Sequence, residues 1–169
     1  MNIKWNDYFM GMIDNVSMKS KDKYTKVGAI ITGSDHEIRS TGFNSFVRGM
    51  NDDIPERQER PEKYWWIEHA ERNAIYNAAR QGISTNGSTL VCVWAACSDC
   101  ARAIIQSGIS ELITINTNDD EADQRWKESN QFGLEMLNEV GIKIVKLDSV
   151  YGNLTPILRN GVKWLPPST

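Results

Sequence analysis

The sequence contains few of the residues that most often bind metals and has little net charge. Its 169 residues include only two histidines and three cysteines, and the net charge is −3. No stretch of Lys and Arg is dense enough to follow a polyanion, which argues against long nucleic acids as partners. The sequence also lacks an apolar run that could span a bilayer or act as a secretory signal. We therefore expect a cytoplasmic protein without a membrane partner.

Length and hydrophobic pattern predict one α/β domain. A chain of 169 residues can bury one substantial core but is short for two domains. Apolar residues recur at helical spacing near the N-terminus, two apolar runs joined by Gly33-Ser34-Asp35 indicate a hairpin, and strands then alternate with helices. Helices are expected at 3–18, 68–80, 97–107 and 121–140, and strands at 27–32, 38–44, 90–94, 112–116 and 142–147.

The connections between these elements predict a mixed five-stranded sheet. Strands joined through helices favour parallel pairing, so the last three strands are expected to be parallel beside an antiparallel N-terminal hairpin. Residues 45–63 are polar and have no sustained period, which predicts a long loop of a kind that is often functional. The pattern fades after residue 148, so we expect a domain over residues 1–148 and an irregular tail over 149–169.

Two short motifs carry the strongest chemical signal in the sequence. His69-Ala70-Glu71 and Cys97-Ser98-Asp99-Cys100 each stand at the start of an expected helix. Cysteines at positions i and i+3 share one helix face, and a helix N-terminus favours the thiolate form that metals require. Together with His69 they offer three ligands, and a zinc site whose fourth position is left to water is typical of catalysis. We expect Zn²⁺ to be bound by His69, Cys97 and Cys100.

Glu71 is the candidate catalytic residue. It lies two positions after His69, a spacing at which helical side chains do not share a face, so it is poorly placed to be a further ligand. A carboxylate beside a metal site can instead take a proton from water and pass it to a ring nitrogen and a leaving amine. That sequence of proton transfers is the chemistry of hydrolytic deamination.

These motifs resemble the cytidine and deoxycytidylate deaminase superfamily, whose signature combines H-x-E with C-x-x-C. The likeness runs over roughly residues 4–147 and is greatest to the deoxycytidylate branch. The matching segments are Lys26-Val27-Gly28-Ala29, Gly42-Phe43-Asn44, His69 to Ile75 and Ala103 to Ile109. The resemblance implies a three-layer α/β/α cytidine-deaminase-like fold and a zinc-dependent hydrolase acting on a cyclic amidine, which would convert dCMP to dUMP and ammonia.

The same resemblance assigns further roles. Asn44 would bind the sugar hydroxyl, and the backbone of Ala70 would read the edge of the pyrimidine. The segment from Lys19 to Lys26, in which Lys21 and Lys26 are the candidates, would approach the phosphate. The resemblance also implies a small-molecule nucleotide as partner and assembly into a homo-oligomer.

Departures from the family pattern keep alternatives open. Ala96, Val47 and Asn116-Thr117-Asn118 stand where the family usually has two prolines and a tyrosine, so another or a modified nucleobase is an alternative substrate. The lysines of residues 19–26 would equally suit a solvated helix end, and Asn44 a strand end. The alternative of another class is a non-catalytic binding module stabilised by zinc. Glu71 argues against it, because a purely structural site has no need of that carboxylate.

Overall fold

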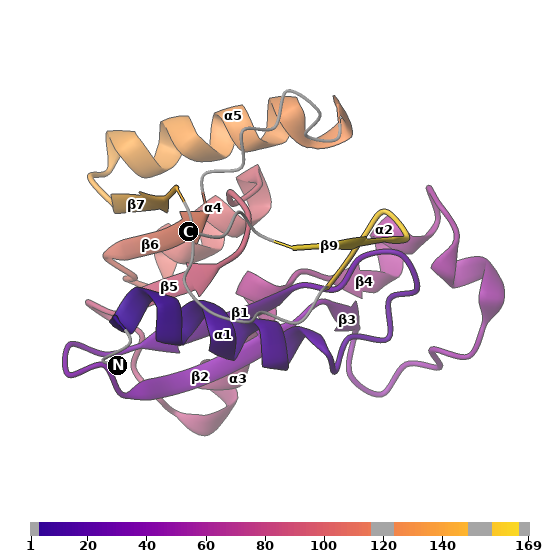
Figure 1. Cartoon of the computed structure of the whole chain (residues 1–169), viewed down its shortest axis with the longest axis horizontal. Coiled ribbons are helices and arrows are strands. Elements are labelled where there is room, and N and C mark those ends of the chain that lie inside the picture. Colours follow the sequence, from indigo (N-terminus) through magenta and orange to yellow (C-terminus); the bar gives the residue numbers. More distant parts are fainter. Residues whose placement is uncertain (1–3, 116–123, 149–156, 166–169) are drawn as a thin grey trace.

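A computed structural model describes residues 4–115, 124–148 and 157–165 of the chain. Its centre is a five-stranded mixed sheet with the strand order β2-β1-β5-β6-β7 (Figure 1). The strands are β1 (Gly28–Thr32), β2 (Ile38–Phe43), β5 (Thr89–Cys92), β6 (Glu111–Ile115) and β7 (Lys143–Leu147). β1 pairs antiparallel with β2 and β5, whereas β5, β6 and β7 are parallel. The expected hairpin and the expected parallel strands are confirmed.

Helices cover both faces of this sheet. The helices are α1 (Trp5–Ser17), α3 (Ala70–Gln81), α4 (Ser98–Gln106) and α5 (Gln124–Glu139). Because successive strand residues point to opposite faces, Ile30 packs with Phe9 and Ile13 of α1, while Ile31 joins the cluster formed with α3 and α4. Burial on both faces confirms the expected α/β fold of three layers. The part of the expected helix over residues 121–123 lies outside the described residues.

The expected long loop contains short elements of its own. β3 (Ser45–Phe46) pairs antiparallel with β4 (Ile67–Glu68), and between them lie the 3₁₀ helix η1 (Pro55–Gln58) and α2 (Lys63–Trp66). None of these elements exceeds four residues. Such short elements are not long enough to produce a hydrophobic period in the sequence, so the sequence did not predict them. Together they bring residues 60–67 beside the beginning of α3.

Residues 157–165 of the tail expected to be irregular over 149–169 contain two strands, while residues 149–156 and 166–169 lie outside the described residues. β8 (Ile157–Arg159) and β9 (Val162–Trp164) form an antiparallel hairpin. Asn160 and Gly161, at its turn, both have positive φ angles, 51° and 80°. Asn-Gly favours such a two-residue turn because both residues tolerate the left-handed region. Within the part of the chain that the structure describes, no helix is long and apolar enough to cross a membrane.

Gly42 sets how closely α3 approaches the sheet. A Cβ atom at this position would lie 2.2 Å from the backbone nitrogen of Ala74 and 2.3 Å from the carbonyl oxygen of Ala70. Both are backbone atoms of α3, so they can give way only if the helix moves. Any such shift would also move the start of α3, which carries Glu71.

We therefore expect Gly42→Ala to lower the free energy of unfolding by about 1–3 kcal/mol, as overpacking of a filled interior does. Gly11→Ala is the matched control, because a Cβ atom there meets nothing within 4 Å and lies inside α1. Alanine is the better helix former, so the control should be stabilised by up to about 1 kcal/mol. Urea unfolding of both variants measures the difference. Equal unfolding midpoints for Gly42→Ala and the unsubstituted protein would contradict the close approach.

Candidate active site

Two helices begin at the same point, and each brings a candidate metal ligand to it. His69 is the N-cap residue of α3 and Cys97 is the N-cap residue of α4, both with extended backbone conformations. Cys100 lies in the first turn of α4. The N-terminal ends of helices carry partial positive charge, so this position favours thiolates over neutral thiols. The fold thus explains why the ligands occur at helix starts.

The spacing of the three donor atoms fits zinc. The His69 Nδ1 atom lies 3.6 Å from the Cys97 Sγ atom and 3.5 Å from the Cys100 Sγ atom. Tetrahedral zinc, with Zn–N bonds of about 2.0–2.1 Å and Zn–S bonds of about 2.3 Å, would separate nitrogen and sulfur by about 3.6 Å. Within the described residues no other His, Cys, Asp or Glu joins this group. The donor set therefore suits zinc with one coordination position left for another ligand.

The electrostatics of the two cysteines also suit a metal. The pKa of the Cys97 thiol is lowered to about 3 by its hydrogen bond with Cys100, against an opposing effect of burial, and further by the His69 ring. Cys97 is therefore a thiolate at neutral pH. The same hydrogen bond, together with burial, raises the pKa of Cys100 well above its ordinary value. A metal ion bound here would displace the proton that Cys100 holds.

Glu71 lies beside these ligands in a pocket of about 320 Å³. Its side chain is buried, and this burial raises the pKa of its carboxyl group above the ordinary value, although the His69 charge opposes the shift. A buried carboxyl group with a raised pKa exchanges a proton more readily near neutral pH than an exposed one does. His69, Ala70, Glu71 and Cys97 all line the pocket. The structure thus brings two of the predicted ligands, Glu71 and Ala70 into the lining of one pocket, and Cys100 lies 3.5 Å from His69.

An aromatic wall stands next to the ligands. The ring of Trp126 meets the His69 ring edge-on, with 5.1 Å between their centroids, and meets Tyr64 in the same way at 5.7 Å. All three side chains line the pocket. Sequence reasoning did not find Trp126, because a tryptophan at the start of α5 gives no local sign of the helix face that reaches the site. Cys92, the last residue of β5, is 1% exposed and also lines the pocket.

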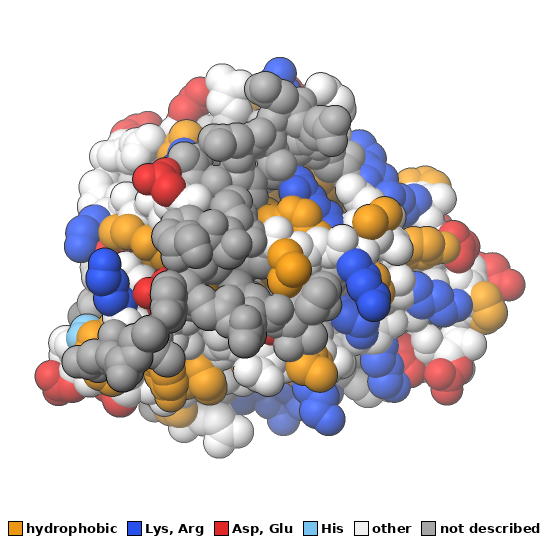
Figure 2. Space-filling model, in the orientation of Figure 1, with side chains coloured by type: hydrophobic (Ala, Val, Ile, Leu, Met, Phe, Trp, Pro, Cys, Tyr) orange, Lys and Arg blue, Asp and Glu red, His pale blue; other side chains and the backbone are white. Residues whose placement is uncertain are grey.

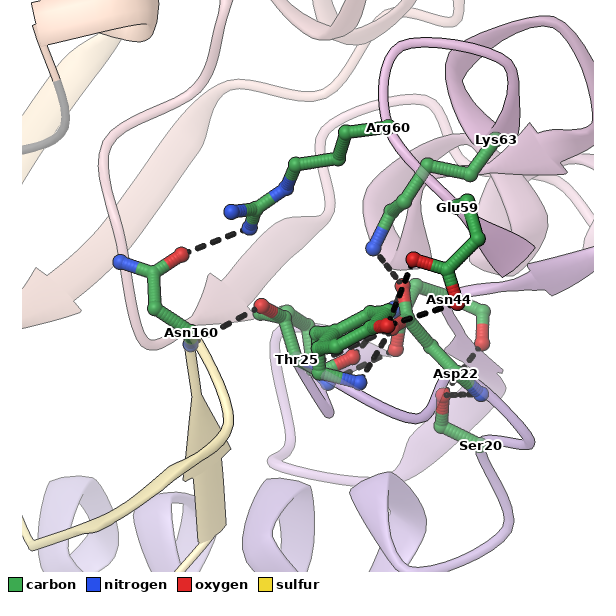
Figure 3. A network of polar contacts seen from close by, with 10 residues as sticks. Ser20, Asp22, Thr25, Asn44, Glu59, Arg60, Lys63 and Asn160 are labelled. Carbon is green, nitrogen blue, oxygen red and sulfur yellow. Dashed lines mark hydrogen bonds and ion pairs between the residues drawn. The ribbon is translucent and has the colours of Figure 1, made fainter.

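The side-chain amide of Asn44 forms hydrogen bonds with other residues of the protein through both its oxygen and its nitrogen (Figure 3). Its Oδ1 atom accepts a hydrogen bond from the Val27 N–H at 2.8 Å. Its Nδ2 atom donates to the Thr25 carbonyl at 2.8 Å and to the Asp22 carboxylate at 3.3 Å. Asn44 lines the pocket, where a ligand could reach it. Its contact with a sugar hydroxyl stays a prediction. In this geometry the amide oxygen would accept a hydrogen bond from the sugar, since both amide hydrogens are already used.

A buried ion pair anchors this network. The Lys63 Nζ atom lies 2.6 Å from the Asp22 Oδ2 atom, and the two side chains are 6% and 2% exposed. The other oxygen of Asp22 accepts hydrogen bonds from the backbone N–H groups of Tyr24 and Thr25. Asp22 thereby joins α2, the segment before β1 and Asn44 (Figure 3). The pocket wall on this side is fixed by polar contacts instead of apolar packing.

The two lysines predicted to approach the phosphate lie elsewhere. Lys21 pairs with Asp52 at 2.6 Å, its side chain is 64% exposed, and Lys26 donates from Nζ to the Ser20 carbonyl. Neither belongs to the pocket lining, so their role stays a prediction. The lining contains Lys63 and two arginines that sequence reasoning missed, Arg60 and Arg159. The signal in the sequence for Arg60 is its place in the long polar loop. The signal for Arg159 is its place directly before the Asn160-Gly161 turn.

We expect Asp22→Asn to destabilise the protein by about 3–5 kcal/mol, because it leaves the buried Lys63 ammonium without its charged partner. Asp52→Asn is the matched control. It removes the acidic partner from an ion pair of the same 2.6 Å separation whose side chains are 64% and 23% exposed, so the unfolding midpoint should change far less. Denaturant unfolding at neutral pH compares the two. Equal effects would show that burial does not distinguish the pairs.

Comparison with known proteins places the chain in a family. The sequence profile of the cytidine and deoxycytidylate deaminase zinc-binding region matches residues 3–116. A probable deoxycytidylate deaminase of Drosophila melanogaster is 34% identical, with 83% of this chain and 71% of the relative covered. The deoxycytidylate deaminase of Homo sapiens is 32% identical, with coverage of 72% and 70%.

A solved structure agrees with this assignment. The dCMP deaminase of cyanophage S-TIM5 in complex with dCMP and dUMP superposes with a TM-score of 0.69 at 25% identity. The superposition covers 87% of this chain and 99% of the phage protein. Its fold is thus the one the described sheet and helices form. The chain belongs to the cytidine and deoxycytidylate deaminase family of hydrolases.

Proposed function

We propose that this protein is a zinc-dependent deaminase that hydrolyses dCMP to dUMP and ammonia. The observation that carries the proposal is the buried Glu71 carboxyl group in the pocket that His69 and Cys97 line, two of the three residues of the donor group that Cys100 completes. The relatives named deoxycytidylate deaminase and the phage structure with dCMP and dUMP support this substrate. The pocket, of about 320 Å³, also falls in the size range of small-molecule sites.

His69, Cys97 and Cys100 would hold the zinc ion. When bound, zinc would lower the pKa of a water molecule and so supply a nucleophile at neutral pH. Glu71 would take one proton from the water that attacks C4 of the cytosine ring and pass it to the ring nitrogen. Its carboxyl group would then take the second proton from the hydroxyl group on C4 and deliver it to the leaving amine. One water molecule is consumed and one ammonia molecule is released for each dUMP formed.

The remaining lining residues bind and orient the substrate in this proposal. The backbone of Ala70 lies between His69 and Glu71, where it can read the pyrimidine edge. Trp126 and Tyr64 exclude water from one side of the ligand group. The proposed partner is a single nucleotide, while a homo-oligomeric state and a cytoplasmic location stay predictions. A role as a binding module alone would leave the buried Glu71 carboxyl group without a use.

The proposal is tested by ammonia release from a panel of substrates. Zinc-loaded protein should deaminate dCMP in preference to cytidine, deoxycytidine, dCTP, 5-substituted dCMP, adenine and guanine. Glu71→Gln should lower kcat by about 10²–10⁴-fold while zinc content is kept, because it removes the proton-transfer group and no ligand. Zinc-loaded protein that releases no ammonia from any of these compounds would overturn the proposal. Loss of zinc from Glu71→Gln would show that the carboxylate is itself a ligand.

Metal analysis of two cysteine variants tests the ligand set. Cys97→Ser should lose zinc, because a hydroxyl group replaces a thiolate donor. Cys92→Ala is the matched control, since Cys92 is equally buried and lines the same pocket but does not belong to the donor group. It should retain one zinc ion per chain. Stoichiometric zinc in Cys97→Ser would contradict the assignment.

A further inference from the structure

We propose that the turn of the β8–β9 hairpin is the phosphate-binding end of the pocket, where Arg159 and Arg60 hold the 5′-phosphate of the nucleotide. The inference rests on the proposed function and adds the residues that distinguish a nucleotide from a nucleoside. Arg60, Arg159 and Asn160 all line the pocket that contains Glu71. The hairpin lies beyond residues 3–116, which match the family profile.

Backbone hydrogen bonds fix the hairpin against the segment before β1. The Lys26 N–H donates to the Leu158 carbonyl at 2.8 Å, and the Gly161 N–H donates to the Tyr24 carbonyl at 2.6 Å. The Asn160 N–H donates to the Thr25 hydroxyl at 3.2 Å. Thr25 also accepts from Asn44 through its carbonyl, so the hairpin turn and the Asn44 network share one anchor (Figure 3). The turn is therefore positioned by the polar network that forms the pocket wall.

Arg159 is oriented by aromatic rings. Its guanidinium carbon lies 5.2 Å from the centroid of the Trp94 ring and 5.9 Å from that of Trp164. Trp94 lines the pocket and precedes Ala95, Ala96 and Cys97 in the chain. Cation–π contacts use the face of a guanidinium group, whereas its N–H donors lie along the edge. This arrangement suits a group that presents hydrogen-bond donors to an anion.

Arg60 approaches the same turn from the loop before α2. Its Nη2 atom donates to the Asn160 Oδ1 atom at 2.7 Å, and Figure 3 shows its side chain extended toward Asn160. Its guanidinium carbon also lies 5.9 Å from the centroid of the Tyr24 ring. Asn160 is a neutral acceptor, so this contact orients Arg60 without cancelling its charge. The two arginines thus reach one end of the pocket from segments about 100 residues apart in the chain.

The pocket lining contains several charged side chains. Lys63 and Asp22 pair at 2.6 Å, and Glu71 follows Ala70 and His69 in the lining. Arg60 and Arg159 are the other cationic side chains of the described lining. A phosphate monoester carries a charge of about −1.5 to −2 at neutral pH, and guanidinium groups bind phosphate through paired hydrogen bonds. In Figure 2, Lys and Arg side chains gather over the half of the visible face that holds α2, β4 and this turn.

Binding and kinetics with matched variants test the inference. In zinc-loaded protein, Arg60→Ala and Arg159→Ala should each raise KM for dCMP and the calorimetric Kd for dUMP by about 10- to 100-fold. kcat and the Kd for deoxyuridine should hardly change, because the pyrimidine end of the pocket is untouched. Arg159→Lys should recover part of the loss. Lys163→Ala is the control, since Lys163 is an exposed cation of the same hairpin outside the pocket lining.

Several results would overturn the inference. Unchanged dUMP binding in both arginine variants would do so, as would an equal loss of deoxyuridine binding, which would indicate a structural role. The same loss in Lys163→Ala would show that the charge of the hairpin as a whole is responsible. Failure of the unsubstituted protein to deaminate dCMP would sink the proposed function instead, while the dUMP titrations would still decide the role of the arginines.

Discussion

The site depends on two helices that must begin at one point. His69 ends the approach to α3 and Cys97 the approach to α4, and their donor atoms come within 3.6 Å of each other although the residues are 28 positions apart in the chain. The sheet makes this meeting possible, because α4 leaves the end of β5 while α3 lies against β2 at Gly42. Both helix dipoles then point their positive ends at the same place, which stabilises thiolates, and the nearby charge of Arg72 favours the Cys100 thiolate as well.

The opposite side of the pocket is built on a different physical principle. Burial of apolar surface holds the ligand helices in place, whereas Asp22, Lys63 and Asn44 hold the loops through charge and hydrogen bonds. A buried ion pair contributes little net stability compared with apolar packing of the same volume, but it tolerates few alternative geometries. Such a network is suited to keeping polar groups at fixed positions around a polar ligand, a task that close-packed apolar side chains do not perform.

Local patterns predicted the chemistry and the sheet but not the pocket wall. His69, Glu71, Cys97 and Cys100 stand in short motifs at helix starts, so their meeting follows from strand and helix order. Arg60 and Trp126 reach the site only through the tertiary placement of a loop and a helix end, which no local spacing encodes. Lys21 is a different case. The family resemblance suggested that it approaches the phosphate, and this role stays a prediction, since its side chain pairs with Asp52 and does not belong to the pocket lining.

The β8–β9 hairpin also has a consequence for how the protein is made. A ribosome delivers the segment of Tyr24 to Lys26 early and the hairpin more than 130 residues later, although the two are joined by backbone hydrogen bonds. Synthesis proceeds from the N-terminus at about 5–20 residues per second. A nascent chain released as far as β7 therefore contains the candidate metal ligands and Glu71 before it has the hairpin wall of the cavity. The residues of the candidate metal site leave the ribosome first, and the residues of the hairpin follow them.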